Sequence, residues 1–431
     1  MLIGTAESDV TPPLGTPLAG YFQERIADGI ISPLMAKAIV LGPPSEKCAL
    51  IVCDLLTMTE EISSKAREII SRNSDIPAQR IMICATHTHT GPELRFGRQI
   101  RCNEEYLREL PERIAKAALQ ADSRQQEAIC CLGAEKEEGL AFNRRFRLAD
   151  GREQFGISDS IETLAAAGPI DPTFGTIVFK KTLESPPFAI LCNYSLHIDV
   201  TGGNRISADY PAVMTETLRK VYGPELFVLY IQGACGNINH VPYRQNNPYP
   251  VKGLWKSGQI GRALAGKALC LSEKALPSHS EKTDLCSEIL QVPKFPKHDP
   301  VLQLRLAQAK EQEKPNFFEQ RLIELAPNYE DSGYSSREVQ TLRIGDAAIC
   351  AAPGEYFVEW GLEIKKWSPA EYTFIAELCN DSAGYIPTYE AFLRGGYEAT
   401  PVVSVTSTPA LGQMIADANF RNLRKLFANN K

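Results

Sequence analysis

The sequence predicts an α/β fold in which mixed β-sheets are flanked by helices, with a metal site at the carboxyl ends of the strands. One observation is that short apolar runs, typical of buried strands, alternate with longer segments of helical spacing. A second is that five of these runs end on a residue able to bind a metal or a substrate. Because functional groups of open α/β sheets gather where strands end, both observations indicate one site.

The five apolar runs predict buried strands. They occupy residues 49–53, 81–85, 188–197, 226–231 and 347–352. The polar residues at or just after their ends are Asp54, His87, His197, the segment 232–240 and Glu355. Imidazole and carboxylate groups are common zinc ligands and common donors and acceptors of protons, so these ends are candidate site positions.

Segments of helical spacing lie between and after these runs. They are residues 60–72, 104–121, 209 onward, 253–276, 303–325 and 409 onward. We expect Asp209 to cap its helix and Pro111 to kink or break the second one. The charged segment 303–325, broken near Pro315, is either a solvated face or a helical cover over the site.

A chain of 431 residues with 44% hydrophobic residues can bury a large core. No linker of biased composition and no repeat of fixed period divides it. We therefore expect a single domain over residues 1–431, with a helical excursion at about 280–335. Within that excursion, residues 282–296 look extended.

Composition excludes several classes of protein. The net charge of −6 argues against nucleic acid as a partner. No apolar stretch reaches about 18 residues, so no membrane span is expected. The N-terminus shows neither the basic nor the long apolar region of a signal peptide. Many of the 12 cysteines lie inside apolar runs, as small buried hydrophobes do in a reducing compartment, and we expect a cytoplasmic protein.

His87 and His89 form the most informative motif. Side chains two apart in a strand leave the same face, so both rings are expected to point into one space. The alternative is that they only cap the strand and bond to the following turn. His197 and Glu355 stand at other strand ends. Two imidazoles and a carboxylate from separate strands, with an open position for water, suit catalytic zinc.

Several blocks in the chain resemble one family, the neutral/alkaline (non-lysosomal) ceramidases. These blocks are residues 4–13 with 20–21, 85–92, 143–144, 171–172, 193–197, 354–355, 385–390 and 397–398. The resemblance runs from Gly4 to about Leu426 and implies the catalytic domain of that family. It does not extend to the C-terminal immunoglobulin-like domain of larger members.

The resemblance also implies roles for individual residues. Zinc would be held by His87, His197, Glu355 and Tyr385. The substrate's polar groups would meet His89, Arg144 and Tyr397. Apart from these, we expect Asn143, Asn239 and His240 to bind the substrate, although His240 could instead simply end a strand. The family's segment Gly-Asp-Val-Ser-Pro-Asn matches residues 236–241 here, so its proposed active-site serine is replaced by Asn239.

We therefore predict a zinc-dependent amidohydrolase that cleaves the C–N bond of a small N-acyl substrate by zinc-activated water, with a place in sphingolipid metabolism. His89 is the candidate proton donor to the leaving amine. Two alternatives stay open: an esterase or lactonase on the same scaffold, and a binding protein with a relict metal site. The sequence fixes neither the acyl chain nor the head group, and it does not address oligomeric state.

Overall fold

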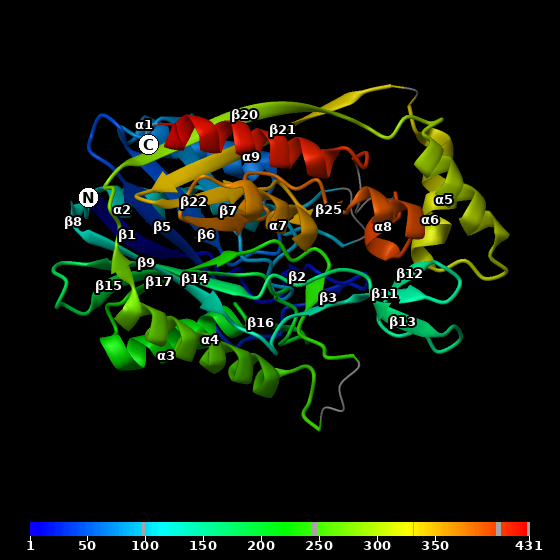
Figure 1. Cartoon of the computed structure of the whole chain (residues 1–431), viewed down its shortest axis with the longest axis horizontal. Helices are drawn as coiled ribbons and strands as arrows, with labels where there is room; N and C mark the ends of the chain where they lie inside the picture. Colours follow the sequence, from blue (N-terminus) through cyan, green and yellow to red (C-terminus); the bar gives the residue numbers. More distant parts are fainter. Residues whose placement is uncertain (97–99, 244–247, 331, 402–406, 429–431) are drawn as a thin grey trace.

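Three larger β-sheets surround a common core in the computed structural model (Figure 1). The model describes residues 1–431 except 97–99, 244–247, 331, 402–406 and 429–431. Sheet 1 has the strand order β7-β6-β5-β1-β8, sheet 2 the order β17-β15-β14-β9-β19, and sheet 3 the order β20-β21-β22-β24. The predicted architecture of mixed sheets flanked by helices is confirmed.

The strands of these sheets are as follows. Sheet 1 contains β1 (Leu2–Asp9), β5 (Met35–Leu41), β6 (Cys48–Cys53), β7 (Ile81–Ala85) and β8 (Gln126–Glu127). Sheet 2 contains β9 (Ile129–Lys136), β14 (Thr173–Lys180), β15 (Pro187–Tyr194), β17 (Phe227–Gln232) and β19 (Leu276–Pro277). Sheet 3 contains β20 (Thr283–Pro293), β21 (Tyr334–Ile344), β22 (Ala347–Ala351) and β24 (Tyr372–Ala376).

A pair of helices covers the outer face of each sheet. The pairs are α1 (Glu60–Arg72) with α2 (Glu104–Asp122), α3 (Tyr210–Tyr222) with α4 (Leu254–Lys274), and α7 (Val358–Trp367) with α9 (Leu411–Phe427). Each pair shares an apolar cluster with its own sheet. Along β6, for example, Leu50 faces the common core, whereas Ile51 packs against the helices. Burial on both faces explains why the strands read as continuous apolar runs.

The three sheets repeat one topology. In each, two antiparallel strands are followed by a third antiparallel strand, a helix, a fourth strand parallel to the third, and a second helix. The parallel pairs are β6 with β7, β15 with β17, and β22 with β24. The three units span residues 2–122, 129–274 and 283–427. The repeat lies in the topology, and no repeat of fixed period is visible in the sequence.

Shorter elements connect the units. They are β2 (Pro17–Leu18), β3 (Arg25–Ile26), β4 (Gly29–Ile30), β10 (Phe142–Asn143), β11 (Arg145–Leu148), β12 (Glu153–Phe155), β13 (Thr163–Ala166), β16 (Arg205–Ile206), β18 (Ile238–Asn239), β23 (Glu355–Tyr356), β25 (Tyr385–Ile386), α8 (Tyr389–Arg394) and the 3-10 turns η1 (Ala78–Arg80), η2 (Ala326–Asn328) and η3 (Tyr397–Ala399). Among the described residues, we find no helix of the length and apolarity that crossing a membrane requires.

Several local expectations can be compared with the structure. Asp209 caps α3 as predicted, and its side chain accepts a hydrogen bond from the amide of Tyr210. Pro111 does not break α2, because the helix continues through it. Residues 282–296 were expected to be extended, and β20 (Thr283–Pro293) forms within them. The charged segment is divided into α5 (Pro300–Glu311) and α6 (Phe317–Leu325), which lie beside α8 (Figure 1).

Candidate metal centre and substrate pocket

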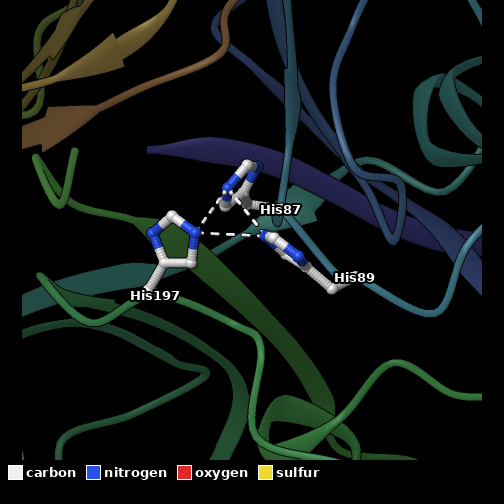
Figure 2. A group of neighbouring side chains, drawn as sticks. All are labelled: His87, His89 and His197. Atoms are coloured by element: carbon white, nitrogen blue, oxygen red, sulfur yellow. Dashed lines mark hydrogen bonds between the residues drawn. The ribbon is translucent and has the colours of Figure 1, made fainter. Parts of the chain in front are cut away.

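Three histidine rings converge on one point where the units meet (Figure 2). His87 comes two residues after β7, and His197 comes three residues after β15. Nε2 of His87 lies 3.0 Å from Nε2 of His197. Nε2 of His89 lies 3.2 Å from that of His87 and 3.1 Å from that of His197.

The two histidines of the motif share this space for a different reason than expected. Strand β7 ends at Ala85, so neither His87 nor His89 belongs to it. His87 adopts a φ of 75°, which side-chain-bearing residues rarely take. Its amide donates to the carbonyl of Leu55 at 2.8 Å, and its ring Nδ1 lies 2.7 Å from the carbonyl oxygen of Leu56. The segment after β6 therefore fixes the ring of His87.

Glu355 brings a carboxylate to the same point. It begins β23, four residues after β22 ends, and its Oε2 lies 3.4 Å from Nε2 of His87. That oxygen is buried and accepts no hydrogen bond from any residue that the structure describes. Burial by itself would raise the pKa of Glu355, but His87, Arg144 and the Tyr385 hydroxyl outweigh it and hold the pKa at about 2. The group is thus an anion with a free oxygen.

The donor set and its spacing fit zinc. Zinc–nitrogen bonds of about 2.0–2.1 Å in a tetrahedron place neighbouring ligand atoms about 3.3 Å apart, close to the separations found here. Because a carbonyl only accepts, Nδ1 of His87 carries the proton and leaves the Nε2 lone pair free. Burial, helped by the other charged groups, lowers the pKa of His197, which favours the neutral, ligating form.

His89 differs from the other two rings in its surroundings. Among the described residues, Nδ1 of His89 has no hydrogen-bond partner. This nitrogen lies 4.0 Å from a carboxylate oxygen of Asp199. Asp199 also pairs with Lys252 at 3.0 Å and accepts from the hydroxyl of Tyr21. Burial lowers the pKa of His89 to about 3. A Cβ at Gly20 would lie 2.6 Å from Nδ1 of His89, so this position needs glycine.

A buried arginine links His197 to two tyrosines. Arg144 lies 3.3 Å from Nδ1 of His197 through Nη1, and its Nη2 donates to the hydroxyls of Tyr397 at 2.7 Å and Tyr385 at 3.1 Å. Its Nε donates to Glu398 at 3.0 Å. Burial raises the pKa of Tyr385 well above its ordinary value, so its hydroxyl keeps its proton in the absence of a cation.

The structure also places the remaining residues that were singled out. Asn239 and His240 line the cavity, and within the described part of the chain neither buried ring nitrogen of His240 has a hydrogen-bond partner. Asn143 is not among the cavity-lining residues: its amide donates to the carbonyl of Pro169 and its oxygen accepts from the amide of Arg145. It therefore shapes the turn that carries Arg144.

Two buried residues near the site, Glu377 and Cys235, were not singled out from the sequence. Glu377 follows β24 directly, is fully buried, and accepts from the amides of Cys235 and Tyr356 at 3.1 Å each. The thiol of Cys235 donates to the other oxygen of Glu377 at 3.0 Å. A signal was present, because residues 372–377 are another apolar run that ends on a carboxylate.

The site opens into a cavity of about 1050 Å³. Aromatic side chains form much of its wall: Tyr21, Phe22, Phe155, Tyr243, Phe317, Phe318 and Tyr397. Phe317 and Phe318 come from α6 and line the cavity, so this part of the charged segment covers the site. Its charged residues Lys310, Glu311, Glu313 and Lys314 are exposed, as expected of a solvated face. The ring of Phe318 lies 4.9 Å from that of Phe22 and 5.2 Å from that of Tyr397.

Comparison with solved structures identifies the fold. The neutral ceramidase from Pseudomonas aeruginosa superposes with a TM-score of 0.74 at 16% identity, covering 99% of this chain and 75% of that one. A structure described as ceramidase complexed with C2 gives a TM-score of 0.73 with the same identity and coverage. The chain therefore has a neutral ceramidase-like fold, as its motifs predicted. Neither a protein-family model nor a curated protein matches it.

Proposed function

We propose that the chain is a zinc-dependent hydrolase that cleaves the amide bond of a small N-acyl substrate. The observation that carries the proposal is the convergence of three imidazole nitrogens and one carboxylate oxygen in an aromatic cavity. The three nitrogens lie 3.0 to 3.2 Å from one another, and the Glu355 oxygen lies 3.4 Å from Nε2 of His87. The fold shared with structures of ceramidases supports the same class of reaction.

We assign His87, His197 and Glu355 as the metal ligands, with Tyr385 completing the set. The hydrogen bonds of the Tyr385 hydroxyl to Glu355 and to Arg144 support this assignment. Bound zinc would polarise the substrate carbonyl and lower the pKa of water to about 7. Arg144 acts through its neighbours: because its Nη2 donates to the Tyr397 oxygen, the tyrosine's own proton can point at the carbonyl oxygen of the substrate.

His89 is assigned to proton transfer. Because its pKa is low, the ring is neutral, and Nε2 can take a proton from the attacking water and deliver it to the leaving nitrogen. Asp199, 4.0 Å from Nδ1, would stabilise the transient imidazolium. No serine nucleophile is needed, and the position of the family's proposed serine holds Asn239, whose amide donates to Tyr243 at 3.1 Å.

The cavity suggests how the substrate lies. An acyl group with an apolar chain would rest on Phe318, Phe155 and Tyr397, whose rings are packed 5.2 to 5.8 Å apart. The leaving amine would then face the polar side, where Lys252 and Asp199 form an ion pair. Such a substrate is amphiphilic, as an N-acylated amino alcohol is.

Metal analysis combined with a substrate panel tests the proposal. The purified chain should carry about one zinc ion, and His87→Ala and His197→Ala should lose it. The control is His279→Ala, because His279 lies outside the cavity-lining set. Chelation should abolish hydrolysis of N-acyl amides. Full zinc in both variants would refute the site. Zinc binding without turnover of any amide would refute the amidase, and faster turnover of esters or lactones would transfer the proposal to those substrates.

A further inference from the structure

Two cysteines face each other where sheet 1 meets sheet 3. Cys84 lies in β7, and Cys379 lies three residues after β24 ends. The two residues pair in an antiparallel bridge. The amide of Asn380 donates to the carbonyl of Ile83 at 2.7 Å, and that of Ala85 to the carbonyl of Leu378 at 3.3 Å. Hydrogen bonds on both sides make Cys84 and Cys379 the non-hydrogen-bonded pair, in which side chains approach most closely.

The loop around Cys379 is held firmly in this position. Leu378 and Asn380 have φ values of 55° and 62°, unusual for residues with side chains. The side-chain oxygen of Asn380 also accepts from the amide of Ile83 at 2.9 Å. These two strained conformations accompany the placement of Cys379 against β7.

Nothing separates the two sulfur atoms. The Sγ atoms of Cys84 and Cys379 lie 2.7 Å apart, and both residues belong to the common apolar core. The thiol of Cys379 donates to the carbonyl of Ala376 at 3.1 Å, which leaves its sulfur lone pairs facing Cys84. All 12 cysteines are present as free thiols in the structure.

We propose that Cys84 and Cys379 are an oxidisable pair that a two-electron oxidant closes into a disulfide. One S–S bond forms and two S–H bonds break. The two electrons and two protons pass to the oxidant, such as diamide, which becomes the hydrazine. In the reducing compartment predicted from the cysteine usage, the pair stays reduced until the oxidant appears.

The position of the pair gives the modification a consequence. Cys84 precedes His87 by three residues, and Cys379 follows Glu377 by two. A disulfide would tie the first unit to the third directly beneath the metal centre. Burial raises the pKa of the Cys84 thiol, so the thiolate is scarce and closure in the folded chain should be slow. Cys130 and Cys131 offer a contrast, since neighbours in a strand point to opposite faces.

Peptide mapping of the full chain tests this without any substitution. Trypsin leaves Cys84 alone in residues 81–95 and Cys379 alone in residues 367–394. After diamide treatment and alkylation in denaturant, these two peptides should be found linked, and reductant should separate them. The thiols of Cys84 and Cys379 should be lost when the two peptides are linked, and reductant should restore both. Oxidation should also raise the melting temperature of the wild type but not of Cys84→Ala or Cys379→Ala, while Cys130→Ala should behave as the wild type does.

Two results would overturn the proposal. One is recovery of Cys84 and Cys379 as separate alkylated peptides after exposure to diamide has continued long beyond full modification of the exposed Cys270. The other is linkage of either residue to a different cysteine. Because the mapping uses the wild-type chain, a variant that fails to fold does not affect the outcome.

Discussion

Replacing Glu398 with glutamine should lower the melting temperature by about 3–6 °C. The Glu398 side chain has 0% exposure and accepts from Nε of Arg144 at 3.0 Å and from Nη1 of Arg145 at 2.9 Å. Arg145 keeps a second carboxylate, Glu153, at 3.0 Å, whereas Glu398 is the only carboxylate paired with Arg144 among the described residues.

The magnitude follows from burial and chain length. Removing one partner of a buried ion pair costs about 3–5 kcal/mol, since the remaining charge stays desolvated. Unfolding entropy is about 2.1 cal/mol/K per residue, or about 0.9 kcal/mol/K for 431 residues unfolding together. Dividing the free-energy cost by this unfolding entropy gives the expected shift in melting temperature. Because Arg144 also orients Tyr397, kcat should fall as well.

Glu390→Gln is the matched control for this experiment. Glu390 also bridges two arginines, Arg147 at 3.2 Å and Arg394 at 2.9 Å, but its side chain is 56% exposed. Exposed pairs contribute about 0–1 kcal/mol, so its melting temperature should change by no more than about 1 °C. Calorimetry on both variants measures the difference. If both variants shifted the melting temperature equally, burial of the Glu398 ion pairs would add nothing to stability, and the reasoning would be refuted.

Three further substitutions probe the site. His89→Gln should keep its zinc while kcat falls by about 10²–10⁴-fold; loss of the metal would instead make His89 a ligand. Phe318→Ala should raise KM by about 2–10-fold for a long-chain amide and leave the acetyl analogue unchanged, and equal effects on both would contradict the aromatic wall. Burial raises the pKa of Glu377 to about 7 from an ordinary 4.5, so the folded chain holds a proton that the unfolded chain loses. The melting temperature of the metal-free wild type relative to that of Glu377→Gln should therefore fall as pH rises from 4.5 to 7; parallel profiles would refute this.

The residue types at the site could be predicted from the sequence because they follow buried strands. An apolar run ending on His197 or Glu355 is visible without any structure, and so is the paired motif at His87. The reason given for the pair was nevertheless incomplete. The rings meet because the loop after β6 holds His87 at a positive φ, and such a long-range constraint leaves no local pattern.

Other features depended on contacts between distant segments. Asp199 lies against His89, because the turn after β15 directs it there. Asp209 accepts hydrogen bonds from the amides of Val200 and Thr201 in that turn. The cover formed by α6 could be stated only as an alternative, because its charged face and its two phenylalanines give no indication of which surface they meet.

The arrangement of the units explains why the geometry had to come from the structure. His87 follows the fourth strand of the first unit, His197 the third strand of the second, and Glu355 the third strand of the third. No single unit can therefore form the site. Its precision depends on the junctions between units, such as the hydrogen bond from the amide of Glu377 to the carbonyl of Gln232 at 3.1 Å. A substitution at a junction should disturb stability and catalysis together, whereas one on an outer helix should affect stability alone.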